Sequence, residues 1–179
     1  MLRITVAQLN YMVGDIAGNV AKMIAAARDA AAARADLVVF SELSLTGYYP
    51  GDLLDEPDFL ARAAQGLLDL QEASAAFPAL HWIVGAPLAR DGSGKHLQNA
   101  LVVLKAGEIV LRYAKQLLPT YNIFDELRHF APGPDVARVL RIGSTQVGLM
   151  ICEDGWNDEG ADYAVNPFSR LADAAPEVA

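Results

Sequence analysis

The chain has 179 residues, of which 53% are hydrophobic and 20% are charged, so it can bury one sizeable core and lacks the composition of a disordered protein. Its net charge of -8, with no cluster of basic residues, argues against nucleic acid as a partner. No segment reaches the roughly 18 apolar residues of a membrane span, and the N-terminus has no signal-peptide pattern. We therefore expect a cytoplasmic protein that binds neither nucleic acid nor membrane.

The N-terminal part of the chain predicts a strand, a helix and a second strand. Residues 2–9 alternate as in a strand, and residues 36–40 form the short apolar run of a strand covered on both faces. Between them, apolar side chains recur at helical spacing from Asn19, which we expect as the N-cap, to Ala31. This order is typical of a parallel crossover unit in an α/β protein.

Further elements follow along the chain. A second amphipathic helix is predicted over residues 58–76 and a weak helix over residues 168–174. Short apolar or alternating runs predict five more strands, the last four of them paired as two hairpins, over residues 81–88, 99–104, 109–113, 137–142 and 146–151. The segment 116–134 between the hairpins contains three prolines and no clean periodicity, so we expect a functional loop there.

The chain has one cysteine, Cys152, which excludes an internal disulfide and a thiolate-rich zinc site. Its three histidines, His81, His96 and His129, have no metal-ligand spacing, so we expect no metal. His129 lies among apolar neighbours with no Asn or Asp placed to orient it, and we assign it a structural role rather than that of a base for the thiol.

Three reactive side chains stand where predicted strands end. Glu42 follows the strand 36–40, Lys115 follows the strand 109–113, and Cys152 follows the strand 146–151. The carboxyl edge of the sheet is the usual place for sites in α/β proteins, so we expect these side chains to converge. A carboxylate among apolar neighbours can take the thiol proton, and an ammonium can stabilise an oxyanion.

Each of these residues also has an ordinary interpretation when it is taken alone. Cys152 can be a small core residue, Glu42 can accept hydrogen bonds in a tight turn, and Lys115 can be a solvated lysine. The combination of the three is therefore more informative than any one of them.

The order Glu, Lys, Cys resembles the catalytic triad of the nitrilase, or carbon-nitrogen hydrolase, superfamily. Four local sequences together resemble the glutaminase domain of glutamine-dependent NAD+ synthetases: AQLNYMVGDIAGNVAKM, DLVVFSELSLTGYYPGDLL, KQLLPTYNIFDELRHFAPG and GLMICEDGW. The resemblance implies the four-layer α-β-β-α sandwich of that superfamily. One position departs from it, since Ser41 stands where the family commonly has proline before the catalytic glutamate.

The resemblance also assigns roles to five residues. It makes Glu42 the general base, Lys115 the stabiliser of the transition state and Cys152 the nucleophile. Tyr121 matches a position that contacts glutamine, and Glu126 matches the second glutamate that many nitrilases place beside the lysine. The implied reaction is hydrolysis of the glutamine side-chain amide through a cysteine thioester, which releases glutamate and ammonia.

The same resemblance implies partners for the chain. Ammonia would pass to an NAD synthetase domain or subunit that amidates deamido-NAD, and ATP and magnesium would act there, so we expect no cofactor in residues 1–179. We expect these residues to form one glutaminase domain that lacks the C-terminal part of the fold and the synthetase domain. An incomplete sandwich exposes apolar surface, which favours a homo-oligomer.

Two alternatives to glutaminase activity stay open at this stage. The chain could be a stand-alone amidase that acts on another small amide. It could also be a non-catalytic assembly module that keeps the residues of the site without the activity.

Overall fold

The computed structural model describes residues 1–157 and 163–179, which form two compact units. The first unit contains residues 1–88 and 100–112, and the second contains residues 89–99 and 113–179. Among the described residues, no helix combines the length and the apolar character that crossing a membrane requires. That the chain is a single domain stays an expectation.

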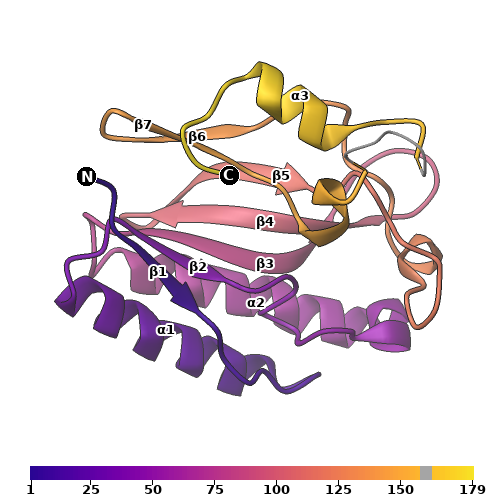
Figure 1. Ribbon diagram of the computed structural model, residues 1–179. Helices are drawn as coiled ribbons and strands as arrows, with labels where there is room; N and C mark the ends of the chain where they lie inside the picture. The colour runs from indigo at the N-terminus through magenta and orange to yellow at the C-terminus, as the bar shows by residue number, and fades with distance from the viewer. Residues whose placement is uncertain (158–162) are drawn as a thin grey trace. The chain divides into compact units, whose positions relative to one another are not determined.

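The first unit is built on a five-stranded sheet whose β4 and β5 continue into the second unit (Figure 1). The strands lie side by side in chain order, and their bounds are β1 (Ile4–Ala7), β2 (Leu37–Phe40), β3 (His81–Ala89), β4 (Leu97–Lys105) and β5 (Glu108–Ala114). β2 pairs in parallel with both β1 and β3. The predicted parallel crossover is therefore confirmed.

Two helices of the first unit bury apolar faces. α1 (Ile16–Ala32) packs against α2 (Pro57–Ser74) and against strands β1 and β2. The apolar stripe of α1 buries Met23 and Ala27 completely, and that of α2 buries Leu70. This burial accounts for the helical spacing of apolar residues in the sequence.

The start of α1 differs from the prediction. The N-cap is Asp15, whose carboxylate accepts a hydrogen bond from the Gly18 N–H at 3.0 Å, so the expectation that Asn19 caps this helix was wrong. Asn19 lies inside the first turns and is buried, and its side-chain amide donates to the carbonyls of Met12 at 2.8 Å and Leu45 at 3.2 Å. Asparagine is used both to cap helices and to bind backbone groups elsewhere in the fold. The residue type alone does not distinguish the two roles, which explains the error.

The predicted hairpin of β4 and β5 is confirmed. The two strands run in opposite directions and are joined by Ala106 and Gly107, both at positive φ, as tight two-residue turns require. α2 anchors this turn, because the Ser74 hydroxyl accepts from the Gly107 N–H at 2.9 Å and the Gln71 side-chain amide donates to the Gly107 carbonyl at 2.8 Å.

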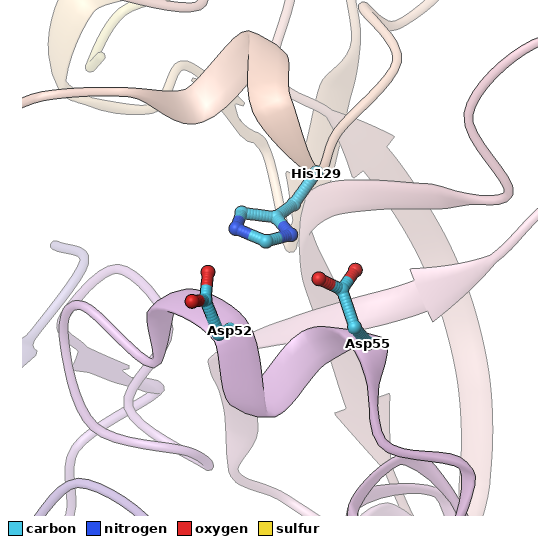
Figure 2. Close-up of side chains that lie close together, drawn as sticks. All are labelled: Asp52, Asp55 and His129. Atoms are coloured by element: carbon cyan, nitrogen blue, oxygen red, sulfur yellow. The ribbon is translucent and has the colours of Figure 1, made fainter.

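A short 3-10 helix, η1 (Gly51–Asp55), leads into α2. It carries Asp52 and Asp55, which are exposed and project from the same side of the helix (Figure 2).

The second unit holds an antiparallel hairpin of β6 (Val139–Ile142) and β7 (Thr145–Gly148), as predicted, and a short helix α3 (Pro167–Asp173). β7 ends earlier than the predicted strand 146–151, and the chain then enters the 3-10 helix η3 (Cys152–Gly155). The loop 116–134 contains one short helix, η2 (Glu126–Arg128). His129 follows η2 and is buried, and its structural role stays a prediction.

Candidate active site

Glu42 lies in a tight turn directly beyond β2 in the first unit. The turn is closed by hydrogen bonds from the Ser44 N–H to the Ser41 carbonyl at 3.1 Å and from the Thr46 N–H to the Leu43 carbonyl at 3.1 Å. Leu43 has a φ of +49°, a conformation that branched side chains rarely adopt. The Glu42 side chain is half-buried, so the turn holds its carboxylate at the end of a buried strand.

A glycine of β3 positions this turn, and the sequence reasoning missed it. The Gly85 carbonyl accepts from the Leu45 N–H at 3.0 Å, and the Gly85 N–H donates to the Ser44 hydroxyl at 3.2 Å. A Cβ atom at position 85 would lie 2.4 Å from the Leu43 nitrogen and 2.5 Å from the Ser41 carbonyl oxygen. Only glycine therefore allows the backbone around Glu42 to approach β3 this closely.

Lys115 and Glu126 form a buried ion pair in the second unit. The Lys115 Nζ atom lies 2.8 Å from Glu126 Oε1, and the two side chains are 1% and 0% exposed. The interpretation of Lys115 as a solvated lysine was therefore wrong. A buried ammonium keeps most of its electrostatic strength because little water screens it, which suits a group that stabilises a developing negative charge.

Hydrogen bonds hold both the backbone N–H and the backbone carbonyl of Lys115. The Lys115 N–H donates to the Asn99 carbonyl at 2.8 Å, and the Lys115 carbonyl accepts from the Gly133 N–H at 2.8 Å. The Asn99 side-chain amide also donates to Glu126 Oε2 at 3.3 Å, so Asn99 contacts both members of the pair. Asn99 escaped the sequence reasoning because it lies inside a strand, where nothing distinguishes it from a structural asparagine.

Cys152 begins the 3-10 helix η3 and is exposed, so the interpretation of Cys152 as a core residue was wrong. Its φ is +42°, in the left-handed region that non-glycine residues seldom occupy. Strained backbone of this kind clusters at functional sites. The thiol is thus held by a defined turn rather than by a flexible loop.

A cavity of about 480 Å³ adjoins this turn and is formed within the second unit by Thr120, Tyr121, Glu153, Trp156 and Tyr163. Glu153, the residue after Cys152, is buried and accepts hydrogen bonds from the Tyr121 hydroxyl at 2.8 Å and the Tyr163 hydroxyl at 2.7 Å. The cavity is therefore lined by a carboxylate and by aromatic side chains. Glu153 was not singled out from the sequence, although it stands beside the predicted nucleophile.

Three other residues of the second unit affect the pKa of Tyr121. The hydrogen bond to Glu153 raises the pKa of the Tyr121 phenol, burial and the charges of Glu153 and Cys152 raise it further, and the charge of Lys115 lowers it. The charges of Cys152 and Lys115 thus act on the pKa of Tyr121 in opposite directions. That Glu42 completes the site beside these residues stays a prediction.

Comparison with known proteins identifies the family. The profile of the carbon-nitrogen hydrolase family matches residues 3–165. A glutamine-dependent NAD(+) synthetase from Xanthomonas campestris is 41% identical over 181 residues, which cover 99% of this chain and 30% of that protein. The chain spans less than a third of the length of the curated relatives it matches, whose covered shares are 32%, 30% and 28% for the first three.

Solved structures show the same fold. The glutamine-dependent NAD+ synthetase from Acinetobacter baumannii, solved with ADP, superposes with a TM-score of 0.78 at 29% identity, over 88% of this chain and 29% of that chain. An amidase from Nesterenkonia sp., of the nitrilase superfamily, superposes with a TM-score of 0.75 at 22% identity, over 86% of this chain and 56% of that chain. The predicted nitrilase-like α/β fold is thereby confirmed.

Proposed function

Because the chain belongs to the carbon-nitrogen hydrolase family, we propose that it hydrolyses the side-chain amide of glutamine to glutamate and ammonia. The observation that carries this proposal is the cavity lined by the buried carboxylate of Glu153, the residue directly after the exposed thiol of Cys152. The thiol suits attack on an amide carbon, and the carboxylate suits the ammonium group of an amino acid.

In the first half of the reaction, Glu42 takes the proton of the Cys152 thiol and the sulfur attacks the amide carbon. The carbonyl oxygen becomes an oxyanion, which the Lys115 ammonium and backbone N–H groups after Cys152 stabilise. The carbon–nitrogen bond then breaks as protonated Glu42 returns the proton to the leaving nitrogen. Ammonia departs, and a glutamyl thioester remains on Cys152.

In the second half, Glu42 takes a proton from water and the resulting hydroxyl attacks the thioester carbon. The carbon–sulfur bond breaks, glutamate leaves, and Cys152 regains its proton from Glu42. Glu126 supports both halves because its contact with Lys115 at 2.8 Å keeps the ammonium in one position.

The cavity favours glutamine over a simple amide. Its volume of about 480 Å³ lies within the range of small-molecule sites. Glu153 lies at the cavity with two phenol hydroxyls on its carboxylate oxygens, so it can accept an ammonium that a neutral amide does not have. Tyr121 adds a hydroxyl and an aromatic face at the same place.

The similarity to glutamine-dependent NAD+ synthetases suggests the destination of the ammonia. We place the reaction upstream of the ATP-dependent amidation of deamido-NAD, with an NAD synthetase domain or subunit as the partner that binds ATP and magnesium. Self-association of the chain is part of the same proposal, and sedimentation of the purified protein measures it directly.

The test measures ammonia and glutamate release from glutamine by the purified protein. We expect release by the parent protein, none by Cys152→Ala, and a raised KM for glutamine in Glu153→Gln. Butyramide serves as the control substrate, because its turnover should not depend on Glu153. Faster turnover of butyramide than of glutamine would favour a simple amidase, and silence of the parent protein on both would favour a non-catalytic assembly module.

A further inference from the structure

Asp154 is the most connected buried side chain near the proposed nucleophile, and the mechanism above does not use it. The residue is completely buried. Its Oδ1 atom accepts from the backbone N–H groups of Gln116 at 2.9 Å and Leu117 at 2.8 Å. Its Oδ2 atom accepts from the Tyr113 hydroxyl at 2.6 Å and from the Ile151 N–H at 3.2 Å.

These partners belong to two segments that are far apart in the sequence. Gln116 and Leu117 directly follow Lys115, whereas Ile151 directly precedes Cys152. One carboxylate thus joins the backbone beside the oxyanion-stabilising lysine to the backbone beside the nucleophile. We propose that Asp154 is a positioning residue that holds the Cys152 turn in register with Lys115, an inference that rests on the proposed function.

The chemistry of a carboxylate suits this role. Two oxygens with two lone pairs each can accept all four hydrogen bonds, and no other side chain of this length offers four acceptor sites. The positive φ of Cys152 needs support from its surroundings, and the bond from the Ile151 N–H supplies support immediately before the strained residue. A shift of about 1 Å between reacting groups can cost about a hundredfold in rate, so such a clamp matters for turnover.

Burial of the Asp154 carboxylate opposes its charge. Burial raises the pKa of the Asp154 carboxyl and outweighs the hydrogen bonds from Tyr113, Leu117, Gln116 and Ile151, which lower it. A carboxyl whose pKa is raised on folding favours the folded state less as the pH rises through that pKa. The hydrogen bonds therefore offset only part of the cost of burying this charge.

The variant Asp154→Asn separates the two sides of the clamp. The amide oxygen can keep the bonds from Gln116 and Leu117, and the Tyr113 hydroxyl can rotate to accept from the amide nitrogen. The Ile151 N–H then faces another donor and loses its acceptor. We expect kcat for glutamine to fall at least about tenfold, while KM changes less than about threefold. The unfolding temperature should fall as well, because the Ile151 N–H is buried and loses its acceptor.

Two further variants complete the design. Leu140→Ala removes buried apolar volume from β6, which supplies none of the hydrogen bonds of Asp154, and should lower the unfolding temperature while kcat is kept. Asp154→Glu keeps the charge but lengthens the side chain by one methylene, so it should lose kcat as Asp154→Asn does. If Asp154→Asn does not fold, Asp154→Glu decides. Full kcat in either folded variant, or a loss confined to KM, would overturn the proposal.

A measurement without glutamine distinguishes this inference from the proposed function. The alkylation rate of Cys152 by iodoacetamide depends on how the surroundings stabilise its thiolate. We expect alkylation to be at least about fivefold slower in both Asp154 variants than in the parent protein and in Leu140→Ala. If alkylation is slower in the Asp154 variants but the parent protein releases no ammonia, the clamp is supported and the glutaminase is refuted. If alkylation and kcat are both unchanged in these variants, the clamp alone is refuted.

Discussion

Replacing Glu126 by glutamine tests whether the ion pair with Lys115 is as buried as the geometry indicates. The two side chains are 1% and 0% exposed with 2.8 Å between their charged atoms. Removing one charge of a buried pair leaves the other uncompensated, at a cost of about 3–5 kcal/mol. Because the single oxygen of a glutamine can still accept from Lys115, although its nitrogen then faces the Asn99 amide, we expect the lower end, about 3 kcal/mol.

The second variant in this series is Lys115→Met/Glu126→Met, in which both charges are absent. Apolar replacement of both members of a buried pair is close to neutral, so this double variant should be at least about 2 kcal/mol more stable than the single variants Lys115→Met and Glu126→Met. It should also be inactive, since Lys115 is absent. A stable and inactive protein would separate the function of the lysine from its contribution to folding.

The assay is urea unfolding followed by circular dichroism, supported by thermal melts. For a chain of this size, about 3 kcal/mol corresponds to a fall of about 6–12 °C in the unfolding temperature. The reasoning fails if Glu126→Gln unfolds within about 1 kcal/mol of the parent protein, or if the double variant is as unstable as the sum of the single ones.

Three further predictions concern other parts of the chain. Gly85→Ala should lower both the unfolding temperature and ammonia release, because its Cβ would lie 2.4 Å from a backbone nitrogen of the Glu42 turn; normal activity would contradict the role of this glycine. Burial lowers the pKa of His81 from 6.5. The neutral imidazole therefore contributes stability above pH 6.5, and this contribution is lost as the pH falls from 6.5 through the lowered pKa of the folded state. The unfolding temperatures at about pH 7.5 and about pH 5.5 should differ less in His81→Asn than in the parent protein. The hydrogen bond to Glu153 raises the pKa of Tyr121 above 10.0, so ultraviolet titration of Glu153→Gln should show that pKa closer to 10.0, and an unchanged titration curve would exclude the bond in solution.

Periodic patterns in the sequence predicted most of the elements. The strand and helix spacings before residue 115 arise from burial against neighbouring layers, which repeats every second residue in strands and about every 3.6 residues in helices. The positions of Glu42 and Lys115 just beyond strands follow from the same patterns, whereas β7 ends at Gly148, before the predicted strand end beside Cys152. The contact between Lys115 and Glu126 agrees with the resemblance to the family, whereas the catalytic roles of these residues stay predictions.

Long-range contacts could not be predicted from spacing. The partners of Asp154 lie up to 41 positions away, and nothing local separates it from a solvated aspartate in a polar turn. The same limit applies to Gly85, whose importance comes from a turn that approaches β3 from another part of the chain. The N-cap of α1 was missed for a related reason, because Asp15 and Asn19 are both good capping residues.

The central claim is that Cys152 attacks the side-chain amide of glutamine. Its most direct test is mass spectrometry of the protein quenched in acid during turnover of glutamine, followed by digestion. We predict one glutamyl group on the peptide that contains Cys152, and none on the corresponding peptide of Cys152→Ala. Ammonia release that persists in Cys152→Ala, without a glutamyl adduct in the parent protein, would contradict the claim.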